Sequence, residues 1–386
     1  HLDLHSFPTR RSSDLEGTKD IQQKILKACS ETSFLSDPLR ILRAVRLAVQ
    51  FDYRITSDTL KLLRQALPQL QQVSPERLRD EIFRLLSIKN LDTSLRILEK
   101  LEILPLIFPE ISNLIEVQQS SPHVMDVWRH TLSVVQKLEQ ILFVLGSDSN
   151  LEESGNIVSS WISLRLGRYR PQIADHFLST LNPERSLQSL LFMAAIYHDA
   201  GKASTQSINS HNAIHFYGHE QTGRDQLIER ARFLRLSNQE IDRLGAIVNG
   251  HMRPFLLNRA SEIPSRRAIY KFWRDLGEAG VDVCLLSIAD LMGTYGPSLP
   301  NEVLTSHLTT VRSLLNAWWE QRQELVAPPS LLNGNQLMQE LNLKPGPVVG
   351  RLLEAIRQGQ VEGTVTNLQQ ALDYSRKWLA SRQTDL

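Results

Sequence analysis

The stretch LLFMAAIYHDAGK, residues 190–202, decides the fold of this chain. Its first eight residues are nearly all apolar, which predicts a helix that is buried over most of its surface. His198 and Asp199 follow directly, so their side chains leave a core, where polar groups need partners. Two interpretations stay open for this pair. Either it binds a metal ion, because imidazole and carboxylate are ligands of divalent metals, or the two side chains hydrogen-bond each other at a helix end.

Composition places the chain among ordinary globular proteins. It has 386 residues, 41% of them hydrophobic and 22% charged, enough for about two or three domains. Lys and Arg number 43 against 42 Asp and Glu, so any nucleic-acid binding must come from local clusters. Cys29 and Cys284 form no CxxC pair, which excludes a disulfide scaffold and a cysteine-rich zinc site. Without a long apolar run or a secretory signal, we expect a cytoplasmic protein with no membrane partner.

Residues 1–15, HLDLHSFPTRRSSDL, match no structural period. We interpret them as a translated sequencing adapter and exclude them from the fold. A basic arm that contacts nucleic acid is the alternative. On the first interpretation the natural chain continues upstream, and the true N-terminus is unknown.

Two helices are predicted near the start of the remaining chain. In SDPLRILRAVRLAVQF, residues 36–51, Ser36 or Asp37 is the expected cap, and the apolar residues recur at helical spacing. Its arginines step by three, which indicates a solvated face or a groove for phosphates: Arg40, Arg43 and Arg46. The second helix lies in SPERLRDEIFRLL, residues 74–86, with Ser74 as cap and Pro75 at its first position.

These two segments resemble the neck of bacterial tRNA nucleotidyltransferases and poly(A) polymerases, the CCA-adding enzymes. In that family a Glu-Asp-x-x-Arg motif reads the base of the incoming CTP or ATP. The resemblance implies this role for Asp37 and Arg40, with Ser36 in the place of the Glu. A carboxylate that accepts from an exocyclic amine and a guanidinium that donates to the ring suit such recognition. The residues alone would indicate only a helix cap beside an ion pair.

The resemblance does not extend to a nucleotidyl-transfer centre. Family members carry it in an N-terminal head with a Gly-rich turn and an Asp-x-Asp pair that holds two metal ions. Neither feature occurs in this sequence, and DLEGTKD, residues 14–20, looks like the last trace of a head. We therefore expect no nucleotide addition by this chain alone.

Further polar residues extend the His198–Asp199 pair into a pattern. His130 lies on a predicted amphipathic helix, where a single histidine is usually a core residue, and Asp290 lies in SIADLMG. Together the four form the His…His-Asp…Asp order of HD-domain phosphohydrolases, which this region resembles. The resemblance implies one or two divalent ions, Mg, Mn, Ni, Fe or Zn. Additional candidate ligands stand in HFYGHEQTG and NGHMRP: His215, His219, Glu220 and His251.

Such a centre hydrolyses phosphoesters. The ion lowers the pKa of a bound water, which then attacks phosphorus. Lys202 either neutralises a phosphate oxygen or simply faces solvent. Within the CCA-adding relatives, the resemblance implies nucleotide 2′-phosphates or 2′,3′-cyclic phosphates as substrates.

Residues 145–186 interrupt the HD resemblance, and we predict an exposed loop followed by a short helix. Arginines interleaved with Trp161 and Tyr169 suit single-stranded RNA, although an ordinary insertion is the alternative. After Pro328 and Pro329, residues 331–379 resemble the family's tail. A Pro345-Gly346-Pro347 turn there opens a helix whose N–H groups either hold an RNA phosphate or only start the helix.

The sequence thus predicts an all-α protein with a multi-helix neck over 16–120, an HD-domain helical bundle over 121–300 and a small helical, tRNA-binding tail over 301–386. The expected function is that of the C-terminal body of a tRNA nucleotidyltransferase with a metal-dependent phosphohydrolase. Its expected partners are tRNA and nucleotides. Two alternatives stay open: a stand-alone HD-type nucleotide phosphohydrolase, and a non-catalytic RNA-binding scaffold.

Overall fold

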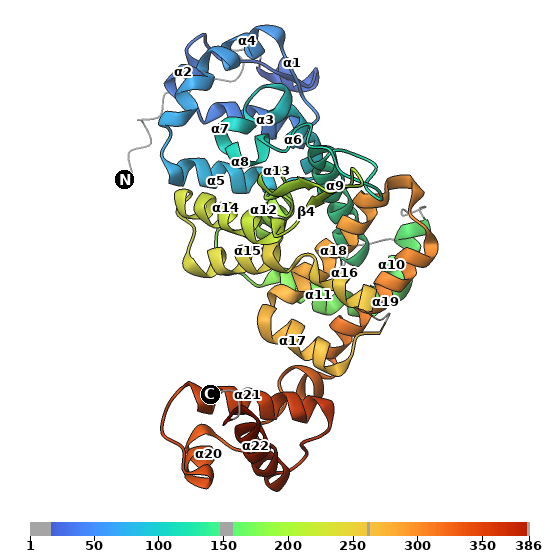
Figure 1. The fold of residues 1–386 in the computed structure, drawn as a ribbon. Coiled ribbons are helices and arrows are strands. Elements are labelled where there is room, and N and C mark those ends of the chain that lie inside the picture. The colour runs from blue at the N-terminus through green and yellow to red at the C-terminus, as the bar shows by residue number, and fades with distance from the viewer. Residues whose placement is uncertain (1–16, 147–156, 261–262, 384–386) are drawn as a thin grey trace, which may run out of the picture. The chain divides into compact units, whose positions relative to one another are not determined.

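A computed structural model describes residues 17–146, 157–260 and 263–383. Residues 1–15 and most of the loop predicted to open the insertion lie outside the described residues. Within them the chain is mostly helical, with two small two-stranded sheets (Figure 1). The prediction of an all-α protein is confirmed. None of the described helices is both long and apolar enough to cross a membrane.

The elements follow one another along the chain in three groups. The first comprises α1(Gly17–Gln22), β1(Ile25–Leu26), α2(Ser33–Ser36), α3(Arg40–Gln50), β2(Arg54–Ile55), α4(Ser57–Ala66), η2(Leu67–Gln72), α5(Pro75–Leu86), α6(Leu91–Lys100), α7(Leu104–Ile107) and α8(Pro109–Ser112). The second comprises α9(Val127–Leu145), α10(Ile157–Leu166), η4(Gly167–Tyr169), α11(Arg170–Leu178), α12(Leu187–Tyr197), α13(Lys202–Thr205), β3(Gln206–Ile208), β4(Ile214–Phe216), α14(His219–Phe233) and α15(Asn238–Gly250). The third comprises α16(Arg253–Ala260), α17(Arg266–Leu276), α18(Ala279–Tyr295), η5(Gly296–Ser298), α19(Asn301–Trp319), η6(Arg322–Val326), α20(Gly334–Leu341), α21(Pro347–Glu362) and α22(Leu368–Gln383).

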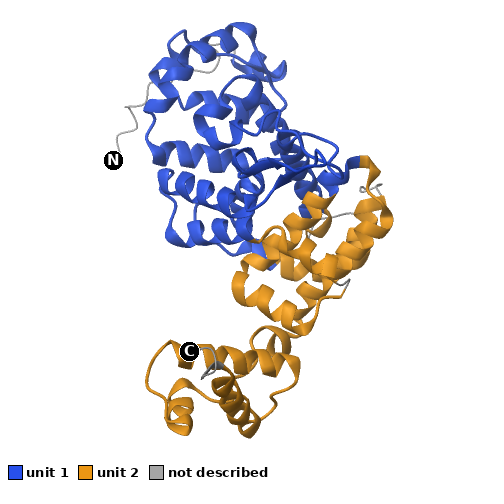
Figure 2. Cartoon of the chain, viewed as in Figure 1, with its two compact units in different colours: residues 1–143, 175–249, 292–296 blue, residues 144–174, 250–291, 297–386 orange. Residues whose placement is uncertain are grey.

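The chain divides into two compact units (Figure 2). The first unit contains residues 1–143, 175–249 and 292–296, and the second contains 144–174, 250–291 and 297–386. The segment 121–300, predicted as an HD domain, contributes residues to both units. The predicted domain boundaries stay predictions.

In the first unit the neck helices bury one apolar face. Ile41, Leu42 and Val45 of α3 are completely buried, as their spacing predicts. The expected cap is wrong: Leu39 occupies the N-cap of α3 and makes no side-chain cap. Asp37 instead accepts a hydrogen bond from Arg77 on α5 at 2.9 Å, because an ion pair between helices satisfies the carboxylate. Ser74 and Pro75 stand at the N-cap and first turn of α5, as predicted.

Helix α12 is the centre of the first unit. Ten of its eleven residues are buried, which confirms the helix predicted from the apolar run. Ser186 caps it by accepting from the backbone N–H of Ser189, and α5 and α14 pack against it. Because this helix is enclosed along its length, the residues at its C-terminal end lie inside the unit.

The second unit is built on α17 and α19. Trp273 stacks on Trp318 at 4.5 Å and donates from its indole N–H to the carbonyl of Leu314. In the insertion, Tyr169 is buried against Trp319, and Arg170 donates to the carbonyl of Val144. These contacts tie the insertion into the helical packing, which favours an ordinary structural insertion.

The tail of the second unit has its own small core. Its helices α20, α21 and α22 share a cluster of buried side chains: Leu332, Leu337, Val349, Leu352, Ile356, Val365, Ala371 and Leu372. Gly346 is the N-cap of α21, and Pro347 stands in its first turn, where a missing N–H leaves no bond unmade.

Candidate metal centre

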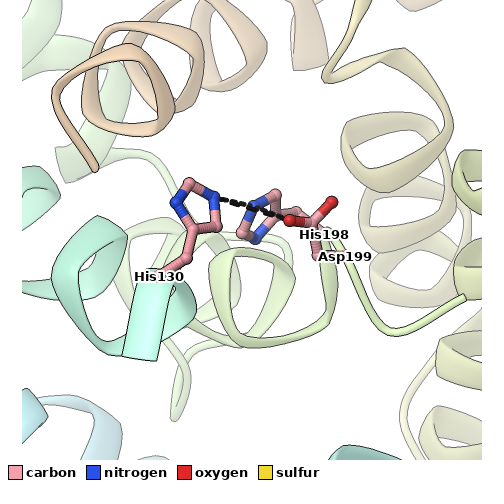
Figure 3. Close-up of side chains that lie close together, drawn as sticks. All are labelled: His130, His198 and Asp199. Atoms are coloured by element: carbon pink, nitrogen blue, oxygen red, sulfur yellow. Dashed lines mark hydrogen bonds and ion pairs between the residues drawn. The ribbon is translucent and has the colours of Figure 1, made fainter. Parts of the chain in front are cut away.

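Three polar side chains from two helices meet in the core of the first unit. His130 extends from α9, and His198 and Asp199 stand at the end of α12 (Figure 3). Nε2 of His130 lies 3.4 Å from Nε2 of His198 and 3.5 Å from Oδ2 of Asp199. Nε2 of His198 lies 3.2 Å from the same carboxylate oxygen. All three residues are at most 2% exposed.

A third imidazole approaches the other oxygen of the carboxylate. Nε2 of His219, at the first position of α14, lies 3.5 Å from Oδ1 of Asp199. Gly218 makes this possible because it turns the chain with a φ of 74°, a left-handed conformation that suits glycine, directly before the helix. Asp199 therefore has imidazole nitrogens on both of its oxygens.

Backbone carbonyls orient two of the three rings. Nδ1 of His198 lies 2.7 Å from the carbonyl oxygen of Ala195, and Nδ1 of His219 lies 2.8 Å from that of Phe216. A carbonyl oxygen can only accept, so in each ring Nδ1 is the donor. In the neutral tautomer this leaves a lone pair on Nε2, the atom that faces Asp199.

Two glycines let the backbones come close enough for this arrangement. A Cβ on Gly201 would lie 2.9 Å from the carbonyl carbon of His219 and 2.8 Å from the nitrogen of Gly223. A Cβ on Gly293 would lie 2.9 Å from Cγ2 of Val134 and 3.2 Å from Nδ1 of His130. All four distances are shorter than ordinary van der Waals contact, so a side chain at either position would push the ligand helices apart.

Lys202 belongs to the same cluster. Its ammonium group forms an ion pair with Oδ2 of Asp199 at 2.7 Å and donates to Oε1 of Gln119 at 2.7 Å, and the residue is only 6% exposed. The alternative of a solvent-facing lysine is therefore wrong. Burial alone would raise the pKa of Asp199, but its interactions with His198 and Lys202 outweigh burial and hold that pKa well below its usual range.

The geometry and chemistry of these donors fit a divalent ion. Imidazole nitrogens bound to one ion at about 2.0–2.1 Å in tetrahedral geometry stand roughly 3.3 Å apart. The separations of 3.2, 3.4 and 3.5 Å among His130, His198 and Asp199 agree with that value. Two nitrogens and a carboxylate oxygen form the donor set of many zinc, iron and manganese sites.

The remaining predicted ligands are two buried residues of the second unit and two residues of the first unit that have other partners. His251 and Asp290 are buried residues of the second unit, 0% and 6% exposed, and their role as ligands stays a prediction. His215 lies on strand β4, where its Nε2 is 2.9 Å from Nδ2 of Asn209. Glu220 contacts the ring of His219 at 3.3 Å, on the Nδ1 side that faces away from Asp199.

The predicted base-reading pair lies at the surface of the neck. Oδ2 of Asp37 and Nε of Arg40 are 4.0 Å apart, and Nη1 of Arg40 donates to the carbonyl of Ser33 at 2.9 Å. The next arginines of the ridge turn inward, because Glu81 is completely buried and accepts from Arg46 at 2.7 Å. The pair is thus held in place, and its reading of a base stays a prediction.

The sequence interpretation missed a second polar cluster beside the centre. The hydroxyl of buried Tyr197 donates to Oε2 of Glu110 at 2.8 Å, and Arg230 pairs with the same carboxylate at 2.8 Å. The signal was present, since Tyr197 is the one hydroxyl-bearing residue in the apolar run before His198. Its partner could not be found, because Glu110 lies 87 positions away.

Comparison with known proteins agrees with the order of these segments. A family model described as "Probable RNA and SrmB- binding site of polymerase A" matches residues 52–115. The HD domain model matches 127–291, and the model of tRNA nucleotidyltransferase domain 2 matches 309–374. Neck, HD region and tail therefore each match a family model.

Similarity to curated proteins runs along almost the whole chain. An A-adding tRNA nucleotidyltransferase of Deinococcus radiodurans is 26% identical over 94% of this chain. A CC-adding tRNA nucleotidyltransferase of Thermus thermophilus is 26% identical over 95% of it. The chain is therefore similar to tRNA nucleotidyltransferases over nearly its whole length.

Solved structures of CCA-adding enzymes show the same fold. A CCA-adding enzyme in complex with CTP matches 95% of the chain with a TM-score of 0.53 and 17% identity. The chain spans 73% and 72% of the two curated family members and 65% of that solved chain.

Proposed function

We propose that the chain is the RNA-handling body of a tRNA nucleotidyltransferase and that its HD region is a divalent-metal-dependent phosphohydrolase. The observation that carries the second part is the convergence of the His130, His198 and His219 imidazoles on the buried carboxylate of Asp199. Buried charges and imidazoles gathered without a ligand would be costly, whereas a bound cation satisfies them together.

His130, His198 and Asp199 would hold the ion, with His219 as a further ligand. A bound divalent ion supplies Lewis acidity toward a water molecule and a phosphoryl oxygen. Lys202 would have two roles in hydrolysis. It fixes the orientation of the Asp199 carboxylate, and it adds positive charge beside the site where the phosphoester reacts. The enclosing helix α12 keeps bulk water away from the buried side of the site. We extend the proposed ligand set to His251 and Asp290, as the HD resemblance implies.

For the RNA-handling part we propose tRNA as the macromolecular partner, with CTP or ATP as substrates of the full-length enzyme and Asp37 and Arg40 as base-reading residues. Support comes from the family matches in the neck and tail. In the second unit, a groove of about 530 Å³ lies between α17, α21 and α22. Arginine and aromatic side chains line it, the residue types that bind RNA backbone and bases: Arg267, Arg351, Tyr374 and Trp378.

The phosphohydrolase proposal is tested by metal analysis and by hydrolysis of a 2′,3′-cyclic nucleotide. We expect purified protein to hold a divalent metal and to hydrolyse the substrate, and His198→Ala and Asp199→Ala to lose both. His176→Ala is the matched control, because His176 lies outside the cluster and pairs with Arg243. If the purified protein holds no metal and hydrolyses no substrate, the phosphohydrolase proposal is wrong, and the non-catalytic RNA-binding scaffold is the interpretation that stands. Hydrolysis by a protein that binds no tRNA would favour the stand-alone phosphohydrolase.

A further inference from the structure

A β-hairpin stands between two parts of the candidate centre. Strands β3 and β4 pair antiparallel, and the segment that contains them joins Lys202 on α13 to His219 on α14. Residues directly opposite each other in such a pair share a face. Ser207 therefore shares a face with His215, and Gln206 shares the other face with Phe216.

The face with Phe216 belongs to the centre. The ammonium group of Lys202 lies 5.4 Å from the centroid of the Phe216 ring, and the carbonyl of Phe216 accepts from Nδ1 of His219. The backbone of Ile214 donates to Oγ of Ser120 at 2.7 Å, which anchors the strand. The hairpin is thus part of the structure that orients His219.

The opposite face carries a stacked pair of aromatic rings, His215 and Tyr217, here called the ledge. The rings of His215 and Tyr217 stack with centroids 5.3 Å apart and an interplanar angle of 11°. Asn209 holds the His215 ring in place. Its Nδ2 donates to Nε2 of His215, while its Oδ1 accepts from two backbone N–H groups of the loop. The ring stacked on His215 belongs to Tyr217, which is 78% exposed. A large aromatic side chain is therefore oriented by the fold and left open to solvent.

We propose that this ledge, Tyr217 stacked on His215, binds the nucleobase of the phosphoester substrate. The proposal rests on the proposed phosphohydrolase function and names a base-binding subsite for it. Tyr217 precedes His219 by two residues, so their Cα atoms are at most about 7 Å apart. A base stacked on Tyr217 lies on the hairpin face opposite Phe216, so its sugar and phosphate would have to pass the turn at Gly218 to reach the centre.

The surroundings of the ledge favour a base over a protein or lipid partner. Bases stack on aromatic rings, and such stacking contributes about 1–3 kcal/mol. On the face of the ledge the hairpin carries polar side chains, on Ser207 and Asn209, whereas its exposed apolar side chain, Ile208, pairs with Ile214 on the other face. Protein and membrane contacts need a wider continuous apolar surface.

Steady-state kinetics of the metal-loaded full chain tests the proposal. The substrates are adenosine 2′,3′-cyclic phosphate and cyclic ethylene phosphate, which has the same ring but no base. For Tyr217→Ala we expect KM for the nucleotide to rise about 5- to 150-fold, as the loss of one stacked base implies. We expect kcat, metal content and the rate with ethylene phosphate to stay unchanged. Tyr217→Phe keeps the ring and should retain the wild-type KM.

An oligoribonucleotide that ends in a 2′,3′-cyclic phosphate identifies the source of the base. A similar KM increase for the mononucleotide and the oligonucleotide means that the terminal base stacks. An increase for the oligonucleotide alone means that an upstream base of RNA occupies the ledge.

The ledge and the phosphohydrolase can fail separately. If the wild type hydrolyses the nucleotide and Tyr217→Ala has the same KM, the ledge proposal is overturned and the hydrolase stands. If the wild type hydrolyses nothing, calorimetric titration with the same nucleotide decides. If Tyr217→Ala then binds the nucleotide more weakly than the wild type does, the ledge proposal is supported. If the two proteins bind it equally, or neither binds it, the ledge proposal is overturned.

Discussion

The hydroxyl of Tyr197 lies 2.8 Å from Oε2 of Glu110 and thereby joins the neck to the helix that ends in His198. Glu110 also pairs with Arg230 of α14, the helix that begins at His219. One neck carboxylate therefore holds the two helices that carry three of the candidate ligands. Glu110 lies within residues 52–115, which match the model of the RNA and SrmB- binding site of polymerase A, so this segment also supports the candidate metal centre.

Tyr197→Phe tests this support. Burial raises the pKa of Tyr197, and Glu110 raises it further, so the hydroxyl stays a neutral donor at all ordinary pH values. Its removal should lower the free energy of unfolding by about 1–2 kcal/mol and weaken metal binding. Urea denaturation and metal titration measure the two effects. Tyr217→Phe, at an exposed site, should leave the stability unchanged, and equal values for both variants would contradict the role of Tyr197.

Gly293→Ala should damage the centre through shape alone. The new methyl group would meet Val134 and the His130 ring at 2.9 and 3.2 Å, so α18 or His130 must move. We expect a destabilisation of about 1–3 kcal/mol and weaker metal binding. Gly350→Ala is the matched control, because it also lies within a helix and its Cβ would meet nothing within 4 Å. Alanine has a higher helix propensity than glycine, so Gly350→Ala should leave the free energy of unfolding unchanged or raise it by up to about 1 kcal/mol.

His307 should make stability depend on pH. Burial lowers its pKa from 6.5 to about 4, and the nearby Asp290 opposes this only in part. The unfolded chain therefore binds a proton between these values that the folded chain does not. The contribution to stability is complete above pH 6.5 and is lost as the pH falls toward 4, by about 2 kcal/mol at pH 5.

Comparison with His307→Asn isolates this contribution, with chelator present to exclude metal effects. The free energy of unfolding of the wild type should fall more between pH 7.5 and pH 5 than that of the variant. Parallel pH profiles would show that His307 takes up its proton as readily in the folded protein as in the unfolded one.

Removing metal should destabilise the wild type selectively. A ligand that binds only the folded state, at 100 times its Kd, adds about 2.7 kcal/mol. Thermal unfolding with metal and with EDTA should therefore give different Tm values for the wild type but not for His198→Ala. A Tm of His198→Ala that still responds to EDTA would place the metal elsewhere.

Local patterns in the sequence identified much of the fold. The apolar run before His198 could only be a buried helix, and Pro75 and Pro347 marked helix starts, because these features depend on neighbours within a few residues. The cap of α3 was wrongly predicted for the opposite reason. Asp37 had a stronger partner in Arg77, forty positions away, which no local pattern reveals.

The sequence by itself determined which chemistry is available: an imidazole, a carboxylate and a lysine at or near the end of a buried helix, and a second imidazole on another helix. Only the tertiary structure decided how they are used. It turned Lys202 inward onto Asp199, supplied Glu110 as the anchor of Tyr197, and stacked His215 beneath Tyr217. Helix formation depends on short-range periodicity, whereas the partner of a buried polar group depends on which distant backbone comes within hydrogen-bond distance. In this chain glycines at positions 201 and 293 set that approach.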